Sequence, residues 1–393
     1  MSDVYERSLK LHEENHGKLE IRSKVSVTNH EELSLAYSPG VAEPCRKIHS
    51  NKDDAYRYTN KGNFVLIVTD GSAVLGLGNI GPEAALPVME GKAILIKQFG
   101  NVDAFPICLG TQDTEEIIKT CKFLAPGIGG ILLEDISAPR CVEIERRLKQ
   151  ELDIPVFHDD QHGTAIVTIA ALISSCRLTG KKIEDLVVVV SGAGAAGSSI
   201  IRMLHDLHVK DIIALNSKGI IHESKKDLYN DLTKELLQIT NKKNITGTIS
   251  DALVGADVFI GVSQAGLVTK EMVQTMNKDP FIFAMANPTP EIMPEEAKAG
   301  GALIVGTGRS DYPNQVNNVL AFPGLFRGAL DCRAKTINEE MKIAAAKAIA
   351  YLIDEKDLRP DYVIPSLFDK RVVTAVREAV IKAAIETKVA RIF

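Results

Sequence analysis

The chain has 393 residues, of which 45% are hydrophobic and 25% charged, a composition typical of a globular protein with two domains. Its formal net charge of -5, without a dense run of Lys or Arg, argues against nucleic acid as a partner. The six cysteines form no CxxC pair and the N-terminus resembles no signal peptide, so we expect reduced thiols and a cytoplasmic location.

The first part of the chain changes from helices to strands near residue 60. Up to that point the pattern is mainly helical, with a turn enforced by Pro39 and Gly40. Apolar runs of strand length then alternate with amphipathic helices, which predicts a mainly parallel sheet covered on both faces. The predicted strands are NFVLIVTD (63–70), AILIKQFG (93–100), GGILLED (129–135) and IPVFHDD (154–160).

A second series of strands follows an apolar helical stretch at 165–176. That stretch is too short and too rich in Ser and Thr to cross a membrane, so we expect a buried helix. The later strands are DLVVVVSG, DIIALNS, ADVFIGV, PFIFAMANP and ALIVGTG, and the tail from about 331 is helical again. The predicted fold is α/β with two domains, 1–160 and 161–393, each with a mainly parallel sheet flanked by helices and the second Rossmann-like.

The pattern GxGxxG occurs twice, at 76–81 and at 192–197. The second copy directly follows a strand and opens an amphipathic helix, as in dinucleotide-binding proteins. There Gly192 would make the turn, Gly194 would let the backbone approach a pyrophosphate, and Gly197 would admit close helix packing. The first copy lies several residues beyond its strand, and we expect a loop shaped for something other than a nucleotide.

The residue expected to hold the adenosine ribose lies at the end of the next strand, at Asn216. An Asp there would bind the 2'-hydroxyl and repel a 2'-phosphate, whereas Asn does neither strongly. Lys218 could accept the phosphate. The sequence leaves NAD and NADP open, with a slight preference for NADP.

Four acids lie at the ends of two predicted strands of the first domain: Glu134 with Asp135, and Asp159 with Asp160. The carboxyl ends of parallel strands are where such sheets bind ligands, so these acids are expected to converge. Oxygen ligands favour Mg²⁺ or Mn²⁺ over Zn²⁺. The alternative is that each pair is exposed or caps a helix.

Two histidines, His158 and His162, flank the second pair of acids. They are four residues apart, as in a zinc-binding helix, but they belong to a strand end and a loop. We therefore predict packing or hydrogen-bonding roles for them.

Six long motifs, in this order along nearly the whole chain, resemble those of malic enzymes of the short microbial form. The motifs are AYSPGVAEPC, VTDGSAVLGLGNIGPEAALPVMEGK, LLEDISAP, FHDDQHGTAIV, MANPTPEI and VNNVLAFPG. The resemblance implies oxidative decarboxylation of L-malate to pyruvate and CO2, with NAD or NADP and with Mn²⁺ or Mg²⁺. It also implies a homodimer.

Carried over motif by motif, the resemblance makes Tyr37 the general acid and Lys92 the general base. An ordinary lysine has a pKa of about 10.4, so burial and nearby cations would have to lower it. The other implied roles are metal ligation by Glu134, Asp135 and Asp160, tuning of the lysine by Asp159, and substrate contacts near the nicotinamide by Asn287 and Asn318.

One motif departs from the family pattern. Longer members carry an arginine in DGxRxLGLG that pairs with a malate carboxylate, and we expect Val74 in its place, with Ser72, Asn287 and Asn318 as candidates to hold that carboxylate. Three other functions stay open: a malolactic-type reaction in which lactate leaves, another hydroxy-acid or amino-acid dehydrogenase, and a dinucleotide-binding regulator without catalysis.

Overall fold

The computed structural model describes residues 2–74 and 76–392 and contains two separate β-sheets. The first sheet has four strands in the order β2-β1-β3-β4, and every pair is parallel. The strands are β1 (Phe64–Thr69), β2 (Asp103–Cys108), β3 (Gly130–Leu133) and β4 (Val156–His158). The order reverses between β1 and β3, and ligands of parallel sheets bind at such a point, outside the carboxyl ends of the strands.

One predicted strand of this sheet is wrong. Residues 93–100 are the last two turns of the helix α5 (Pro82–Gly100). The buried residues of α5 recur at helical spacing: Ala85, Met89, Lys92, Ala93, Ile96 and Gly100. The strand that the sequence analysis missed is β2, whose Pro106 is tolerated because β2 is an edge strand.

Helices cover the first sheet. Besides α5, these are α6 (Thr114–Leu124) and α7 (Arg140–Glu151). The segment that links β4 to the next helix is a π-helical turn, Asp159–Gly163, which we call the acidic turn. π-Helical turns of this kind are frequent at functional sites.

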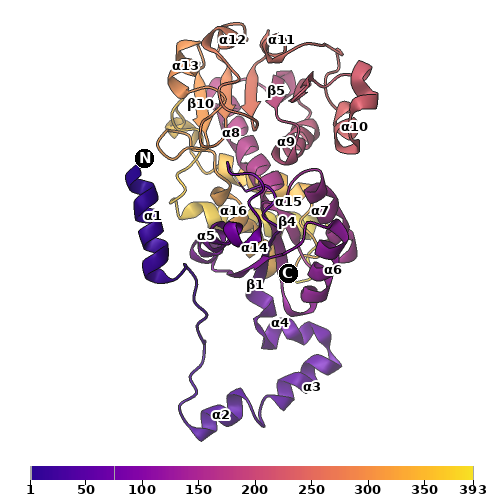
Figure 1. Cartoon of the computed structure of the whole chain (residues 1–393), viewed down its shortest axis with the longest axis vertical. Helices are drawn as coiled ribbons and strands as arrows, with labels where there is room; N and C mark the ends of the chain where they lie inside the picture. The colour runs from indigo at the N-terminus through magenta and orange to yellow at the C-terminus, as the bar shows by residue number, and fades with distance from the viewer. Residues whose placement is uncertain (1, 75, 393) are drawn as a thin grey trace.

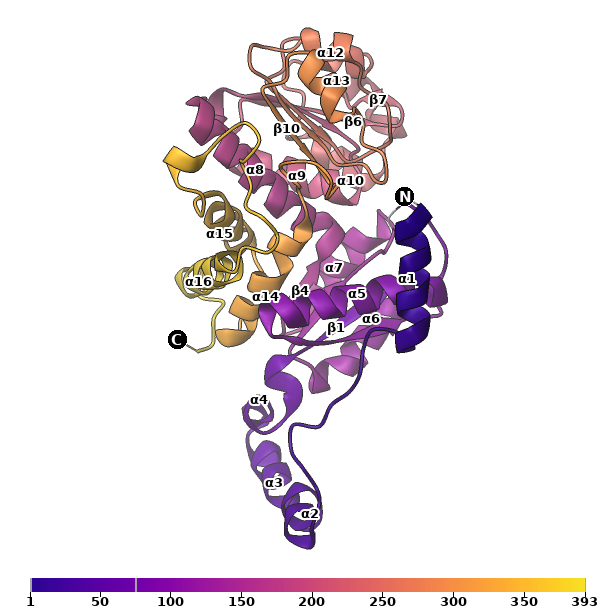
Figure 2. The same ribbon diagram turned by 90° about the vertical axis from the view of Figure 1, so that its left-hand side faces the viewer.

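The N-terminal region forms an arm that projects from the rest of the molecule (Figures 1 and 2). After α1 (Ser2–Asn15), the arm consists of α2 (His30–Ala36), α3 (Ala42–Ser50) and α4 (Ala55–Tyr58). None of these last three helices has a buried residue. Within this chain the arm therefore has almost no core of its own.

The second sheet has six strands in the order β10-β9-β8-β5-β6-β7. The strands are β5 (Val187–Ser191), β6 (Asp211–Asn216), β7 (Gly219–Ile220), β8 (Val258–Gly261), β9 (Phe281–Ala284) and β10 (Ile304–Thr307). All pairs are parallel except β6 with β7. The five longer strands coincide with the predicted ones, and the short antiparallel β7 was not predicted.

The helices of this half are α9 (Ala195–Asp206), α10 (Asp231–Leu237), α11 (Ile249–Leu253), α12 (Lys270–Gln274) and α13 (Pro294–Ala299). Strand order reverses at β5, and α9 follows β5 directly. This is the doubly wound, Rossmann-like arrangement that the sequence predicted.

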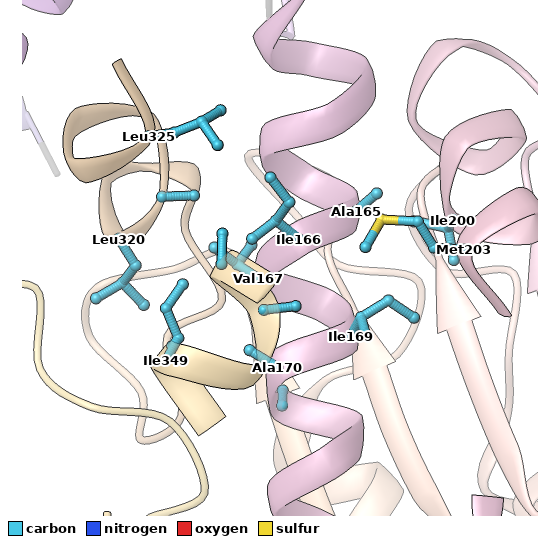
Figure 3. Close-up of a cluster of buried hydrophobic side chains, with 14 of the residues drawn as sticks. Ala165, Ile166, Val167, Ile169, Ala170, Ile200, Met203, Leu320, Leu325 and Ile349 are labelled. Atoms are coloured by element: carbon cyan, nitrogen blue, oxygen red, sulfur yellow. The ribbon is translucent and has the colours of Figure 1, made fainter. Parts of the chain in front are cut away.

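The helix α8 (Thr164–Thr179) lies between the two halves and is buried along most of its length, as predicted. Figure 3 shows its apolar side chains between Ile200 and Met203 of α9 on one side and Leu320, Leu325 and Ile349 on the other. These last three come from the C-terminal region, which includes α14 (Phe322–Asp331), α15 (Glu339–Ala350) and α16 (Arg371–Glu386). The helix α14 also packs on α5, so the C-terminal region contacts both halves.

The division of the chain at residues 160 and 161 stays a prediction. The acidic turn lies at that point, between β4 and α8, and contacts α9. Among the residues that the structure describes, no helix is long and apolar enough to cross a membrane.

Candidate active site

Three carboxylates come together at the carboxyl ends of β3 and β4. Oxygen atoms of Glu134, Asp135 and Asp160 lie within 4.8 Å of one another. Glu134 and Asp135 follow β3 and are buried, and Asp160 belongs to the acidic turn. Parallel pairing of β3 with β4 brings the two segments to one edge, as the strand-end argument predicted.

The backbone of Asp135 is shaped for this cluster. Its φ is 53°, in the left-handed region that few residues other than glycine adopt. Its N–H donates to Asp160 Oδ2 over 2.8 Å, and its carbonyl oxygen accepts from the N–H of Ala73 over 2.9 Å. Strained conformations held in this way cluster at functional sites.

Lys92 lies on the buried side of α5, beside the cluster. Its Nζ is 2.8 Å from Glu134 Oε1 and 2.7 Å from Asp159 Oδ2, and it lies 4.7 Å from the ring centre of Phe322. Asp159 is fully buried and Lys92 is 8% exposed. A lysine so enclosed has a defined position and direction, which a solvent-exposed lysine lacks.

The charges around Lys92 act in opposite directions on its pKa. Burial lowers the pKa, but the carboxylates of Asp159 and Glu134 outweigh burial and hold it above the ordinary value. Burial in turn raises the pKa values of the carboxyl groups of Glu134 and Asp159. The lowering of the lysine pKa expected from the sequence is therefore not what this arrangement of acids produces.

The cluster fits a hard divalent cation. Glu134 Oε2 is buried and has no hydrogen-bond partner among the described residues, although a buried carboxylate oxygen is normally paired. The three acids offer only oxygen ligands, which suits Mg²⁺ or Mn²⁺. Among the described residues, the cation in contact with Glu134 is Lys92, which pairs through Oε1 and leaves Oε2 free for a metal ion.

The two histidines take different roles, and neither belongs to the carboxylate cluster. The ring of His162 is 2.7 Å from Glu145 Oε2 and 2.8 Å from Ser199 Oγ, a hydrogen-bonding role. His158 is fully buried, and its Nδ1 lies 3.8 Å from Asp160 Oδ2.

The three glycines of the 192–197 motif occupy three different environments. A Cβ on Gly192 would lie 2.5 Å from the carbonyl oxygen of Val262, and the φ of Gly192 is 102°. A Cβ on Gly197 would lie 1.8 Å from the carbonyl oxygen of Gly192, whereas nothing lies within 4 Å of that position on Gly194. These are the turn, the close packing and the open approach that a pyrophosphate needs.

The end of β6 has the features expected at the adenosine side. Asn216 Oδ1 accepts a hydrogen bond from the N–H of Lys218 over 2.8 Å. The side chain of Lys218 is exposed, and the Nζ of Lys225 lies 3.2 Å from the carbonyl oxygen of Lys218. Two lysines thus lie close to one another after the end of β6.

The two predicted asparagines lie beside two different loops. A Cβ on Gly163 of the acidic turn would lie 3.0 Å from the Cβ of Asn318. A Cβ on Gly76 would lie 3.5 Å from the carbonyl oxygen of Asn287. The structure therefore brings Asn318 to the acidic turn and Asn287 to the first glycine-rich loop.

Tyr37, the predicted general acid, lies far from the carboxylate cluster within this chain. It directly follows α2, which lies at the far end of the arm in Figures 1 and 2, and its side chain is 69% exposed. Lys92 is enclosed between β3, the acidic turn and α14. The two side chains are therefore separated within one chain.

The departure in the DGxRxLGLG segment needs a correction. When DGxRxLGLG is matched letter by letter to this sequence, its arginine falls on Ala73 and not on Val74. The side chain of Val74 is buried in the core. The Oγ of Ser72 is already engaged, because Arg140 Nη2 donates to it over 2.9 Å and so does the N–H of Ser137. Ser72 is therefore a weak candidate to hold the malate carboxylate.

Sequence reasoning missed two residues that shape the site. Arg140 pairs with the buried Asp70 at 2.8 Å and bonds Ser72, which fixes the loop after β1. Glu145 bonds His158, directly before the acidic turn, and His162 within it. Arg140 follows the LLEDISAP motif, which was a signal for it, whereas Glu145 looks like any acid of an amphipathic helix.

Comparison with known families decides the classification. Two protein-family models match the chain. The model described as "Malic enzyme, N-terminal domain" matches residues 16–149, and the model described as "Malic enzyme, NAD binding domain" matches residues 161–385. This chain belongs to the malic enzyme family. Several relatives that match it are named as NAD-dependent or NADP-dependent malic enzymes, so NAD(P)-dependent oxidative decarboxylation of malate is the reaction of its family.

Individual malic enzymes are similar over nearly the whole chain. The bifunctional malic/malolactic enzyme of Bacillus subtilis is 62% identical, covering 98% of this chain and 94% of the relative. The NAD-dependent malic enzyme of Geobacillus stearothermophilus is 56% identical, and the match covers 95% of this chain and 78% of the relative. The crystal structure of the malic enzyme from Pyrococcus horikoshii superposes with a TM-score of 0.95 at 47% identity, covering 99% and 92%.

Proposed function

We propose that this chain converts L-malate to pyruvate and CO2 with reduction of NAD or NADP, with Lys92 as base, Tyr37 as acid and Mn²⁺ or Mg²⁺ as cofactor. The observation that carries the proposal is the buried ion pair of Lys92 with Glu134, beside the three-carboxylate cluster. A regulator that only binds a dinucleotide needs neither feature.

The chain's own residues divide the work of the reaction. Glu134, Asp135 and Asp160 would hold the cation, and Gly194 leaves room for the cofactor's pyrophosphate. When bound, the cation stabilises negative charge on substrate oxygens and NAD(P) accepts a hydride from C2 of malate. The residues present fit both groups.

Lys92 would remove the proton of the C2 hydroxyl group. For this it must be neutral, yet Asp159 and Glu134 keep its pKa high. Glu134 raises the pKa of Lys92 through its negative charge. A cation bound to Glu134 would offset that charge and so lower the pKa of Lys92. Tyr37 would then donate a proton to C3 after CO2 has left.

We propose NADP as the better cofactor. Asn216 carries no charge that would repel a 2'-phosphate. Its Oδ1 accepts from the backbone N–H of Lys218, and Lys225 Nζ lies 3.2 Å from the carbonyl oxygen of Lys218, so both lysines are close enough in the chain to pair with such a phosphate. Relatives with either preference match the chain, so the preference follows from these side chains alone.

We further propose a homodimer in which the arm of one copy reaches the other. Tyr37 and the neighbouring Leu33 and Leu35 are exposed on helices that have no buried residue. A site that needs both Lys92 and Tyr37 is incomplete in one chain, and a second copy would supply the tyrosine and cover the apolar arm.

A malolactic reaction is the second candidate. The relative from Bacillus subtilis, 62% identical, is named as a bifunctional malic/malolactic enzyme. In that reaction the reduced cofactor stays bound and lactate leaves instead of pyruvate.

One assay separates these functions. With L-malate, Mn²⁺ and NADP or NAD, the purified chain should release reduced cofactor and pyruvate in equal amounts. Lactate without reduced cofactor would assign the malolactic reaction, and absence of both products would overturn the proposal. Lys92→Ala should lose activity by about 10²–10⁴-fold if Lys92 is the base, and full activity of this variant would remove it from that role.

A further inference from the structure

A buried glutamate on α7 makes hydrogen bonds to the residue directly before the acidic turn and to a residue near its end. Glu145 lies on α7 and is 3% exposed. Its Oε1 accepts from the N–H of His158 over 3.1 Å, and its Oε2 lies 2.7 Å from Nε2 of His162. These two anchors lie two residues before and two residues after Asp160.

The direction of the hydrogen bonds around His162 is determined by its neighbours. Lys342 Nζ lies 3.0 Å from His162 Nδ1 and 2.6 Å from a carboxylate oxygen of Glu339. A lysine ammonium has only donors, so Nδ1 must be the acceptor and Nε2 must carry the proton. His162 therefore donates from Nε2 to Glu145, and Ser199 Oγ lies 2.8 Å from Nδ1.

The charges around Glu145 agree with this assignment. Burial raises the pKa of Glu145, but the positive charge of Lys149 and the hydrogen bond from His162 hold it well below its usual range. Lys149 Nζ lies 3.0 Å from Glu145 Oε1 and supplies the positive charge that this buried carboxylate needs.

The contacts join four parts of the fold at one point. Glu145 and Lys149 belong to α7, one of the helices that cover the first sheet, and His162 belongs to the acidic turn. Ser199 comes from α9, the helix that the dinucleotide motif opens, and Lys342 from α15. We propose that Glu145 is a positioning residue of the metal site. By bonding His158 before the acidic turn and His162 within it, Glu145 fixes the position of the Asp160 carboxylate between them. This inference rests on the proposed metal site.

The substitution Glu145→Gln removes one anchor whichever way the new amide is oriented. If its oxygen faces His158 and Lys149, its NH2 group faces the N–H of His162. If the amide is turned around, its NH2 group faces the N–H of His158 and the ammonium of Lys149. In both orientations a donor meets a donor, which a carboxylate avoids.

The test is direct Mn²⁺ binding to the full chain, measured by electron paramagnetic resonance of free Mn²⁺ without malate or NAD(P). Glu145→Gln should weaken binding by about 10- to 100-fold, as loss of a residue that orients a ligand does. The matched control is Glu143→Gln on the same helix, whose exposed carboxylate lies 3.8 Å from Arg147 and should bind as the parent chain does. Parent-like Mn²⁺ binding by Glu145→Gln would overturn the inference.

A second pair of variants tests the same role if Glu145→Gln does not fold. The amide of His162→Gln can place a donor where Nε2 was, toward Glu145, whereas the shorter His162→Asn reaches only toward Ser199. We expect His162→Gln to bind Mn²⁺ within about threefold of the parent and His162→Asn to lose about 10-fold or more. Equal binding by the two variants would contradict the role of Glu145.

The variant Asp160→Asn separates the two proposals. It should lose Mn²⁺ binding if the carboxylate cluster is the metal site. Parent-like binding by Asp160→Asn would overturn the metal site itself, whereas loss in Asp160→Asn with parent-like binding in Glu145→Gln would overturn only the positioning role.

Discussion

The ammonium group of Lys92 lies 2.7 Å from the carboxylate of Asp159, and both side chains are buried. Asp159 is the carboxylate with the largest raising influence on the pKa of Lys92. The acid next to a metal ligand thus acts on the proposed base, which makes the two aspartates of the DD pair separable by experiment.

Asp159→Asn should shift the pH dependence of the reaction. Removal of the negative charge lowers the pKa of Lys92, so the neutral lysine is reached at lower pH. The acidic limb of kcat/KM should therefore move down by about 1–3 pH units, and the plateau rate should fall because the base is weaker. A pH-rate profile at saturating Mn²⁺ measures this, and an unshifted limb would show that Asp159 does not tune Lys92.

Addition of Mn²⁺ should stabilise the chain against heat. A ligand that binds only the folded state at 100 times its Kd adds about 2.7 kcal/mol to the free energy of unfolding. Glu134→Gln should abolish most of this increase. Without Mn²⁺ the variant should be no less stable than the parent, because Glu134 is buried and the repulsion between its charge and the neighbouring carboxylates is gone. Thermal melts with and without Mn²⁺ measure both effects, and an equal Mn²⁺ response in the variant would exclude Glu134 as a ligand.

The sequence was sufficient to predict the part of the candidate site that lies at the ends of the parallel strands. Acids at the ends of two neighbouring parallel strands must meet at one edge, so the approach of Glu134 to Asp160 follows from topology. The three glycines of the second motif likewise act within one local turn. In both cases the information is local or depends only on strand order.

The remaining features depend on packing that local patterns do not encode. Residues 93–100 have strand-like composition, yet they complete a 19-residue helix whose apolar face is already in place. Glu145 lies beside the apolar stripe that includes Ile144 and Leu148, and only the approach of the acidic turn determines whether such an acid is buried. Tyr37 was assigned from its sequence motif. A motif does not indicate whether the tyrosine would complete a site in its own chain or in a second copy.

Lys218→Ala should weaken binding of NADP more than binding of NAD. The exposed ammonium group can pair with a 2'-phosphate but has no partner on a ribose hydroxyl. We expect the KM for NADP to rise about 10-fold, with little change in the KM for NAD. Lys119→Ala, on α6 of the other half, is the charge-matched control. Equal changes for both cofactors would indicate that Lys218 does not contact the 2'-phosphate.

Mixed dimers should reveal whether the arm is shared between copies. Tyr37→Phe and Lys92→Ala homodimers should each lose about 10²–10⁴-fold in kcat. If the arm of one copy serves the other, a hybrid of the two variants contains one site with both Lys92 and Tyr37 and one site with neither. Such a hybrid, isolated with two different affinity tags, should regain about half of the parent activity per dimer, one of its two sites being complete. If each arm serves its own chain, every site lacks one residue and the hybrid stays as inactive as the homodimers.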